Sequence, residues 1–572
     1  MRSSRSGMRP LVLLPLLAGG VAACSNMLVG RSASASGSPQ IAYTSDAGFQ
    51  YGGMGHYPAA DHPAGTMRDV FNEDSGAYSG QIAEAPHTYN AVAYHGGMNE
   101  HQLAISETTF GGLAALHGQK GLIDYGTLMD LALQRCRTAR EAIRFIGEIL
   151  SEYGYASSGE SISIADATEV WLMELVSKGA GEKGVVWVAR KVPDDSACSH
   201  ANQARIRTWP RDDKVAMWAN DTVSFAVKKG LYPEDADPLQ FSFSDTFCPV
   251  DFAGARLAEA RVYNMLKEVT DDPSFASDYL SYAQGYNLTN RMPLFVKAKA
   301  PLTVNDTSWL MRTRFTGTWF DERKDVGAGA SHAEYRQRPL MWTSNGTKFV
   351  NERTVGVQQN AFHFVANPRV EYTNTPIGGV IWSGCDDQSL AVRFPAYASS
   401  TALPPTWIEG PTQNRTVFKM RSSHWAFNMV ANFAYAHWET VLPVVQAKIV
   451  ATEASFASEL AAMDATAKAL LHGPGGSRAK AIEALTAFTV RTGDDLVDEW
   501  NAFFGELFVR FSDGFDASAK PRSAKQTIEP TYIKGGTSTV DVQEKGYSAD
   551  VSASAPDSYL PRFVYAIVVA SI

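Results

Sequence analysis

Cys24 is the residue whose position points most directly to chemistry. Residues 1–23 place three arginines before an apolar run from Leu11 to Leu17, and small residues follow up to Ala23. This order is typical of a cleaved export signal, and the run is too short to span a bilayer. Removal of the segment after Ala23 would make Cys24 the first residue of the mature chain.

An N-terminal cysteine carries a nucleophile and a base in one residue. An unperturbed thiol has a pKa near ~8.5 and an α-amine one near ~7.7–8.0, so the amine can accept the thiol proton at neutral pH. The thiolate can attack an amide carbonyl, and water then hydrolyses the acyl-enzyme. We therefore expect Cys24 to act as a catalytic nucleophile in amide hydrolysis.

The residues after Cys24 predict a hairpin that brings Asp46 beside it. Two β-type runs, Met27–Val29 and Ile41–Thr44, flank a stretch rich in Ser and Gly. Cys24 then stands at the head of one strand and Asp46 at the end of the next. Asp46 is the natural anionic partner of the Cys24 amine; the alternative is that it only caps a turn.

The other familiar catalytic signatures are absent. The sequence contains no Gly-x-Ser-x-Gly, no His-Glu-x-x-His, no Walker loop, and no GxGxxG between a strand and a helix. Its five cysteines are widely scattered, with no CxxC and no His/Cys ligand spacing. We therefore expect neither a metal nor a cofactor. The adjacent acids Asp386 and Asp387 are interpreted as a solvated turn.

Composition limits the partners. The chain has 572 residues, is 45% hydrophobic and has a formal charge of −9 without a basic stripe. These values describe a globular protein and argue against a nucleic-acid partner. The sequence leaves a homo-oligomer open.

The order of predicted elements favours an α+β fold rather than a parallel βαβ sheet. Strand pairs come first, a helical pair follows, and strands then resume. Thr138 and Glu141 form a capping-box start for the second helix. The predicted strands are Val92–Tyr94 and Leu103–Ser106, a pair around the loop Gly96–Glu100, then Ser161–Ala165, Val170–Val176 and Gly184–Val192; the predicted helical regions are Tyr125–Leu150 and Trp425–Phe511, the second broken at Gly473–Gly476.

Four segments follow from these patterns. We expect an export signal over 1–23, a catalytic domain over 24–420, a helical extension over 421–511 and a weakly structured tail over 512–572. The tail is rich in small and charged residues and ends in an apolar run, which leaves a C-terminal membrane anchor as an alternative to a terminal strand.

Several short strings, in chain order, resemble the C69-type dipeptidases from Cys24 to about residue 510. The most telling is Ser199–Ile206, SHANQARI. The others are Cys24–Gly30, Gly97–Glu100 followed by Ser106–Phe110, Trp171–Glu174, Trp187–Ala189 and Val192–Asp195.

This resemblance implies an N-terminal-nucleophile (Ntn) hydrolase fold, with two antiparallel sheets stacked between helices in an αββα sandwich, related to bile-salt hydrolases and penicillin acylases. It places the catalytic aspartate at Asp46 and an oxyanion-binding amide at Asn202, which is otherwise an ordinary turn residue. It assigns a site arginine to Arg256, for the thiolate or a substrate carboxylate. Arg261 competes for that role, and a surface salt bridge is the alternative for Arg256.

Two further positions take their roles from the resemblance. Asn99 and Glu100 are candidates for substrate binding, although Asn99 could equally hold the backbone. One departure concerns the position three residues before Asp46, where many relatives carry arginine and this chain has Tyr43. Either Arg256 provides the positive field alone, or thiolate formation depends more on the amine.

The resemblance implies the activity of a thiol-dependent dipeptidase that acts on small peptides, and the export signal predicts that it acts outside the cell, in the periplasm or in a vesicle lumen. An acylase for a non-peptide amide is the first alternative. The second follows from Val21–Cys24, which also fits a bacterial lipobox. Lipid on Cys24 would block both catalytic atoms and leave a membrane-tethered binding protein, so a membrane is a partner only through Cys24 or the tail.

Overall fold

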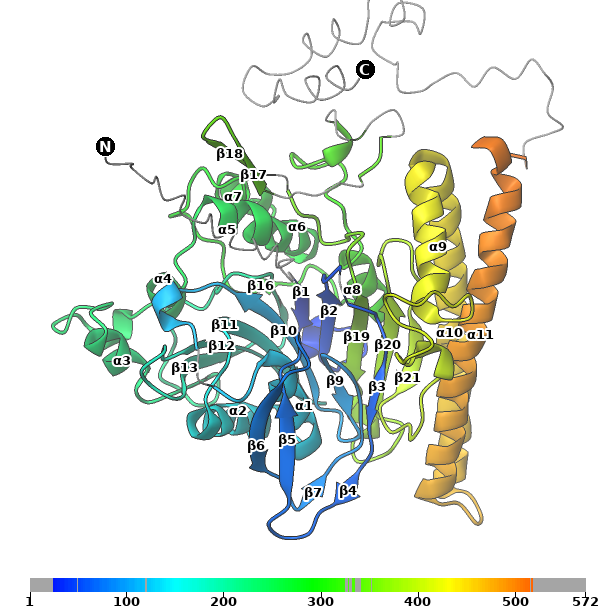
Figure 1. The fold of residues 1–572 in the computed structure, drawn as a ribbon, viewed down its shortest axis with the longest axis horizontal. Coiled ribbons are helices and arrows are strands. Elements are labelled where there is room, and N and C mark those ends of the chain that lie inside the picture. Colours follow the sequence, from blue (N-terminus) through cyan, green and yellow to red (C-terminus); the bar gives the residue numbers. More distant parts are fainter. Residues whose placement is uncertain are drawn as a thin grey trace, which may run out of the picture.

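The computed structural model describes residues 24–517 except 49, 119–120, 325–327, 329–331, 335–340, 351 and 515. The predicted export signal and nearly all of the predicted tail therefore lie outside the described residues. Within them, two large antiparallel sheets stand beside a helical C-terminal region (Figure 1). The α+β class and the helical region are as expected from the sequence.

The first sheet has seven strands and holds the predicted hairpin at its centre. Cys24 directly precedes β1, and β1 and β2 pair antiparallel, with Ser25 opposite Thr44. The two residues that flank this pair, Cys24 and Asp46, therefore stand at one end of the sheet, as predicted. In spatial order the strands are β16 (Val296–Lys297), β14 (Ser196–His200), β1 (Ser25–Val29), β2 (Gln40–Ser45), β19 (Phe362–Pro368), β20 (Gly379–Cys385) and β21 (Phe394–Tyr397).

The second sheet has eight strands and packs against the first. Its long central strands, β11 and β12, are buried at every position, and their short β-type runs bounded by turn signals made them recognisable from the sequence. In spatial order the strands are β15 (Ala216–Trp218), β13 (Val185–Lys191), β12 (Val170–Ser177), β11 (Gly159–Ala165), β10 (Ala104–Phe110), β9 (Gly96–Asn99), β8 (Ala91–Tyr94) and β3 (Gly55–Tyr57).

The structure differs from the strand pair that was predicted around the loop at Gly96. The segment predicted as a loop around Gly96 is itself a strand, β9, which lies between β8 and β10. Gly96 and Gly97 have φ values of 94° and 146°, and a Cβ at Gly97 would lie 2.3 Å from the Val92 carbonyl oxygen. Only glycine tolerates this backbone, so two glycines that suggested a loop form a tight strand connection.

A buried polar network joins the two sheets. Asn26 on β1 donates from Nδ2 to the Glu107 carbonyl (2.7 Å) and accepts from Ser163 Oγ (3.1 Å). His200 on β14 contacts Thr108 (2.7 Å) and Ser163 (2.8 Å). Because buried polar groups are costly unless paired, this network fixes how the sheets are stacked.

Two helices cover the outer face of the eight-stranded sheet. They are α1 (Tyr125–Arg135) and α2 (Ala139–Tyr153), and Thr138 caps α2 by accepting from the Glu141 backbone N–H, as predicted. Their apolar faces pack with Ile105, Ile162 and Ile164 in one buried cluster.

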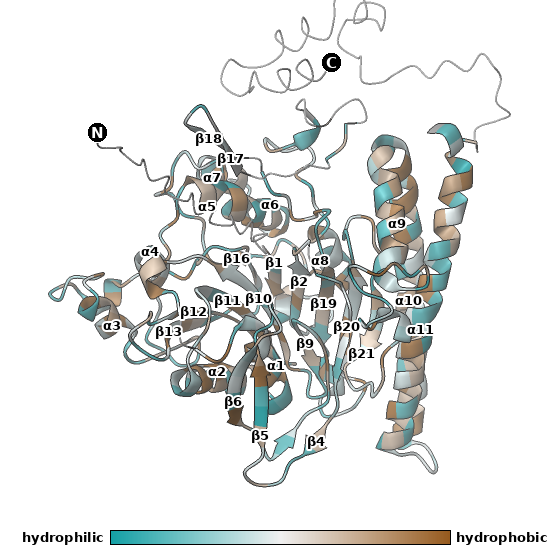
Figure 2. Cartoon of the chain, in the orientation of Figure 1, coloured by the Kyte–Doolittle hydropathy of each residue, from teal (hydrophilic) through white to brown (hydrophobic). Residues whose placement is uncertain are grey.

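The C-terminal region consists of three helices that stand against the seven-stranded sheet (Figures 1 and 2). They are α9 (Ser423–Ala436), α10 (Trp438–His472) and α11 (Arg478–Arg510), and the predicted break at Gly473–Gly476 is confirmed. Apolar and polar residues share each helix (Figure 2), and the buried ones face the sheet.

The remaining elements are short or peripheral. Shorter strands are β4 (Ala60–Asp61) with β7 (His87–Thr88), β5 (Met67–Phe71) with β6 (Tyr78–Ala83), and β17 (Met341–Ser344) with β18 (Thr347–Val350). Shorter helices are α3 (Thr222–Lys228), α4 (Phe243–Phe247), α5 (Phe252–Gly254), α6 (Ala260–Val269), α7 (Phe275–Ala283) and α8 (Val304–Leu310).

The interpretation of Asp386 and Asp387 as a solvated turn is wrong. Both are buried just after β20. Arg314 forms an ion pair with Asp387, and Asn428 donates to Asp386 at 3.0 Å. Partners from distant segments therefore stabilise two adjacent acids inside the protein.

Candidate active site

Cys24 lies in a closed polar site at the end of β1. Its side chain is 3% exposed in the full-length chain. Burial raises the pKa of the thiol well above its usual value, and the nearby carboxylates Glu107 and Asp46 raise it further. The Tyr43 hydroxyl and the Asp46 backbone N–H lower it. The thiol of the uncut chain is therefore protonated at neutral pH and needs a base.

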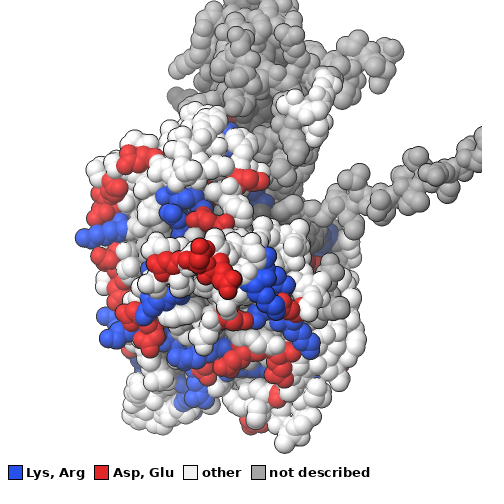
Figure 3. Space-filling model, turned by 90° about the vertical axis from the view of Figure 1, so that its left-hand side faces the viewer, with Lys and Arg blue, Asp and Glu red and all other residues white. Residues whose placement is uncertain are grey.

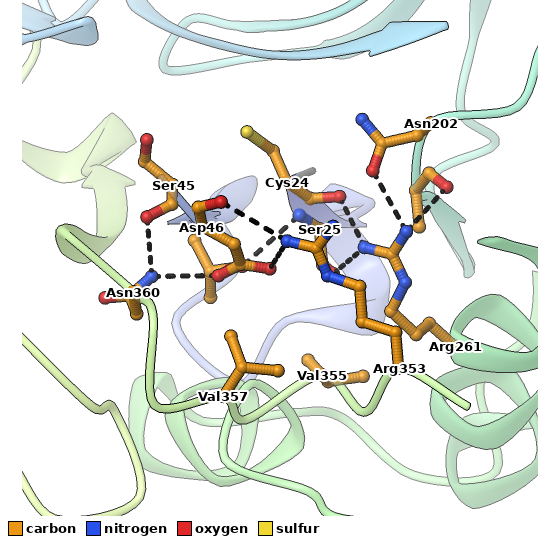
Figure 4. A network of polar contacts seen from close by, with 12 residues as sticks. Cys24, Ser25, Ser45, Asp46, Asn202, Arg261, Arg353, Val355, Val357 and Asn360 are labelled. Carbon is orange, nitrogen blue, oxygen red and sulfur yellow. Dashed lines mark hydrogen bonds and ion pairs between the residues drawn. The ribbon is translucent and has the colours of Figure 1, made fainter. Parts of the chain in front are cut away.

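Asp46 follows β2 and is held by two donors (Figure 4). Arg353 Nη2 lies 3.3 Å from its Oδ2, and Asn360 Nδ2 lies 3.1 Å from its Oδ1. Burial raises the pKa of Asp46 to about 6, although Arg353, Arg261 and Asn360 act in the opposite direction. Asp46 is thus a buried carboxylate, fixed in orientation beside Cys24.

Arg261 on α6 fixes the backbone at Cys24. Its Nη1 donates to the Cys24 carbonyl (2.8 Å) and to Ser25 Oγ (2.9 Å). Its Nη2 donates to the Ala201 carbonyl (3.1 Å) and Asn202 Oδ1 (2.9 Å). Burial lowers the pKa of Arg261 to about 9, while Asp46 and Cys24 act to raise it.

Asn202 is locked in place beside Cys24 by contacts at both ends of its side-chain amide. Its backbone has a φ of 62°, in the left-handed region that asparagine tolerates better than most residues. Oδ1 accepts from Arg261, and Nδ2 donates to the Thr109 carbonyl at 2.7 Å. This second bond uses one of the two N–H groups of the amide.

A second group of residues contacts the sulfur of Cys24 itself. Glu107 on β10 accepts from the Cys24 thiol, with 3.5 Å between Sγ and Oε1. The Tyr43 hydroxyl lies 2.7 Å from the same Oε1 and 3.4 Å from Sγ. Tyr43 therefore joins the nucleophile to a carboxylate without adding a positive charge.

Behind Glu107 lies a second buried acid, Glu160 on β11. Thr109 Oγ1 lies 3.4 Å from Glu107 Oε2 and 3.2 Å from Glu160 Oε2. The Tyr155 hydroxyl donates to Glu160 at 2.6 Å. Burial and the charge of Glu107 raise the pKa of Glu160 well above its usual value. Burial and the neighbouring acid therefore favour the protonated form of Glu160.

Of the predicted site residues, the structure brings together Cys24, Asp46 and Asn202, and it adds Arg261 rather than Arg256. Arg256 forms an ion pair with Glu352 and donates to the Gln284 carbonyl at 3.2 Å. Its guanidinium also stacks over aromatic rings, including Trp319.

Asn99 and Glu100 lie on the turn after β9 and support the fold there. Asn99 is buried; its Nδ2 donates to the carbonyls of Leu133 (2.7 Å) and Cys136 (2.8 Å) at the end of α1. Glu100 accepts from the Asn90 backbone N–H at 3.0 Å. Neither is among the described residues that contact Cys24, so substrate binding by them stays a prediction.

Sequence reasoning did not single out Glu107, Arg353 or Asn360. Glu107 stood inside the string Ser106–Phe110 and carried no separate signal of function. Arg353 and Asn360 lie more than 300 positions from Asp46, and only the pairing of β2 with β19 brings them near.

Further observations on the described residues concern disulfides, metal sites, membrane-spanning helices and surface charge. All five cysteines are free and buried, and within the described residues no cluster of His, Cys, Asp and Glu could hold a metal ion. None of the described helices has the length and apolar character to cross a membrane. On the face drawn in Figure 3, charges of both signs are interspersed.

Comparisons with known proteins agree on one family. The sequence profile of Peptidase family C69 matches residues 23–450. A probable dipeptidase of Latilactobacillus sakei is 23% identical over 450 residues, covering 73% of this chain and 82% of the relative. A probable dipeptidase of Salmonella dublin is 30% identical over 244 residues, 39% and 52% of the two chains. Dipeptidase A of Lactobacillus helveticus is 21% identical over 410 residues, 68% and 78%.

Proposed function

Because this chain belongs to peptidase family C69, we propose that it is a cysteine-type dipeptidase whose nucleophile is the N-terminal Cys24 of the mature chain. The observation that carries the proposal is the position of Cys24: it stands at the head of β1, beside a buried Asp46 and within the hydrogen bonds of Arg261. The matched profile begins at residue 23, immediately before Cys24.

The first chemical step is proton transfer from the thiol to the α-amine of Cys24. In the mature protein the amine is free, and Asp46 beside it stabilises the ammonium that forms. The thiolate attacks the scissile carbonyl of the dipeptide, the ammonium returns a proton to the leaving amine, and the C-terminal amino acid departs. Water, activated by the same amine, then hydrolyses the thioester.

The developing oxyanion needs fixed donors. Asn202 is suited to this role because Arg261 and Thr109 hold its amide rigidly and one N–H of Nδ2 is not used by the Thr109 bond. Arg261 is a positioning residue in this scheme, since its donors are directed to the Cys24 carbonyl and to Asn202.

The arrangement of the sheets supports an Ntn-hydrolase architecture. The nucleophile precedes a central strand of one sheet, a second sheet packs against it, and helices lie outside both. We propose that the chain matures by a cut after Ala23 and that the enzyme acts after export.

The direct test compares Cys24→Ala with Cys136→Ala, which removes a different buried thiol, at the end of α1. Cys24→Ala should abolish hydrolysis of a panel of dipeptides and leave the fold intact by circular dichroism. Cys136→Ala should keep the wild-type rate, and thiol alkylation should inactivate the wild type. Full activity of Cys24→Ala would refute the mechanism. Hydrolysis of acylated amides without hydrolysis of any dipeptide would favour an acylase instead.

A further inference from the structure

The carboxylate of Glu107 is an unusual neighbour for a nucleophilic thiol. A negative charge 3.5 Å from Sγ opposes thiolate formation, and it raises the pKa of Cys24. Among the described residues, the groups that hydrogen-bond to the Glu107 carboxylate are those of Cys24, Tyr43 and Thr109, none of which is a cation, and the neighbouring acid Glu160 also interacts with it. A buried carboxylate without a cation is costly, and a bound cation would offset that cost.

We propose that Glu107 binds the α-ammonium group of the substrate's N-terminal residue and thereby makes the site selective for peptides with a free N-terminus. This inference rests on the proposed dipeptidase function and goes further, because it names the group that is recognised and the residue that recognises it.

Bond geometry supports the assignment. In any peptide the α-nitrogen of the first residue is about 2.5 Å from its own carbonyl carbon. A thiolate ready to attack lies about 3–3.5 Å from that carbon. The ammonium is therefore within roughly 6 Å of Sγ. Glu107 Oε1 lies 3.5 Å from Sγ, which puts it within reach of a charge-assisted hydrogen bond to that ammonium.

The other acid beside Cys24 is already occupied. Asp46 accepts from Arg353 and Asn360, and the amine of Cys24 adds a further charge on that side. Glu107 is therefore the acid of the pair that has room for a second cation. Tyr43 strengthens this distinction, because its hydroxyl orients Glu107 Oε1 without neutralising it.

Two further acids, Asp74 and Glu73, act on neighbours that also feel the charge of Glu107, namely Tyr125 and His95. Asp74 is exposed and accepts from the Tyr125 hydroxyl at 2.9 Å. Glu73 is half-buried and contacts His95 at 3.2 Å. The charge of Glu107 acts on both Tyr125 and His95, so these residues lie near it. Negative charge gathered in this region favours the approach of a cationic group.

Binding of the ammonium has a consequence for the nucleophile. When a positive charge lies on Glu107, the field that opposes ionisation of Cys24 is cancelled. The substrate therefore helps to activate the thiol that attacks it, and an amide that lacks the ammonium meets a less reactive sulfur.

The test measures kcat/KM for a cleaved dipeptide and for its des-amino analogue, in which hydrogen replaces the ammonium. The wild type should prefer the dipeptide by about 10²-fold or more, the size of a lost charge-assisted hydrogen bond. Glu107→Gln should lower kcat/KM for the dipeptide by about 10²-fold, whereas the rate on the analogue should not fall, because the charge that opposes ionisation of Cys24 is gone. The preference should therefore disappear.

Glu160→Gln is the matched control, because it replaces the other buried acid of the pair, on the neighbouring strand, by a neutral amide. It should keep the wild-type preference. An unchanged preference in Glu107→Gln, or an equal loss on both substrates, would overturn the assignment and leave the dipeptidase intact. A wild type that cleaves the analogue but no dipeptide would refute the proposed function itself.

Discussion

Within the described part of the chain, buried negative charge is paired with cations on one side of Cys24 but not on the other. On one side Asp46 is held by Arg353 and Asn360, with Arg261 close by. On the other side, the hydrogen bonds that the described residues give to Glu107 and Glu160 come from the Cys24 thiol and from the hydroxyl groups of Tyr43, Thr109 and Tyr155. The compensated side is complete without a ligand and suits the fixed machinery of the reaction. The uncompensated side becomes complete when a cation arrives, as expected of a site for substrate.

The largest effect is expected on the compensated side, from Arg261→Met. This change leaves two buried backbone carbonyls without their donor and removes one of the two buried cations near Asp46, which costs about 3–5 kcal/mol of folding free energy. Loss of the support for Asn202 should lower kcat by about 10³-fold in the protein that remains folded. Denaturant unfolding and single-turnover kinetics measure the two effects.

Arg256→Met is the matched control for that variant, since Arg256 is also buried but contacts Glu352 instead of Cys24. It should lower kcat by less than about tenfold. Greater loss of activity in Arg256→Met than in Arg261→Met would show that the wrong arginine has been placed at the site.

The pH dependence of kcat/KM tests the role of Asp46, on the same side of Cys24 as Arg261. Its pKa is raised to about 6, so the carboxylate loses its charge as the pH falls through this value, and the Cys24 ammonium loses its anion. The ammonium itself acts to lower that pKa, so kcat/KM should fall about tenfold per unit below pH 6 or slightly lower.

The free energy of unfolding should depend on pH in the opposite sense, because the Asp46 contribution to it falls as the pH rises. The pKa of Asp46 is higher in the folded protein than its ordinary 3.8, so protonation of this group favours the folded state. That contribution is present at low pH and is lost as the pH rises through about 6.

Asp46→Asn should have low activity, and its kcat/KM profile should lack the fall below about pH 6. An unchanged fall in the variant would assign it to another group.

The smallest effect is expected on the uncompensated side, from Tyr43→Phe. The variant removes one hydroxyl that contacts both Glu107 and the sulfur, and it changes no charge. We expect kcat/KM for dipeptides to fall about 3- to 10-fold, the value of one hydrogen bond. The preference for a free amine should persist, as measured with the des-amino analogue. Loss of that preference would assign recognition of the ammonium to Tyr43.

Local sequence patterns predicted the parts of the fold that depend on local physics. The hairpin that joins Cys24 to Asp46 follows from two β-type runs and a small-residue turn, and the start of α2 follows from its Thr138 cap. The β9 strand did not follow, because a glycine pair is equally compatible with a loop and with close backbone packing.

The distinction between Arg256 and Arg261 depends on helix geometry. A π-helical turn at Ala255–Glu259 precedes α6, so a regular 3.6-residue period does not tell which arginine faces Cys24. Glu107 acquires its neighbours only when the two sheets stack, since Cys24 and Tyr43 are 83 and 64 positions away. Asp386 and Asp387 were misread for the same reason, since their partners come from distant segments.

The central claim is that the mature protein begins at Cys24 with both its amine and its thiol free. Intact mass and N-terminal sequencing of the active protein, purified from the producing cell, test it most directly. The predicted result is a chain that starts at Cys24 and carries no adduct. A lipid on Cys24, or full dipeptidase activity in a chain that retains residues 1–23, would contradict it.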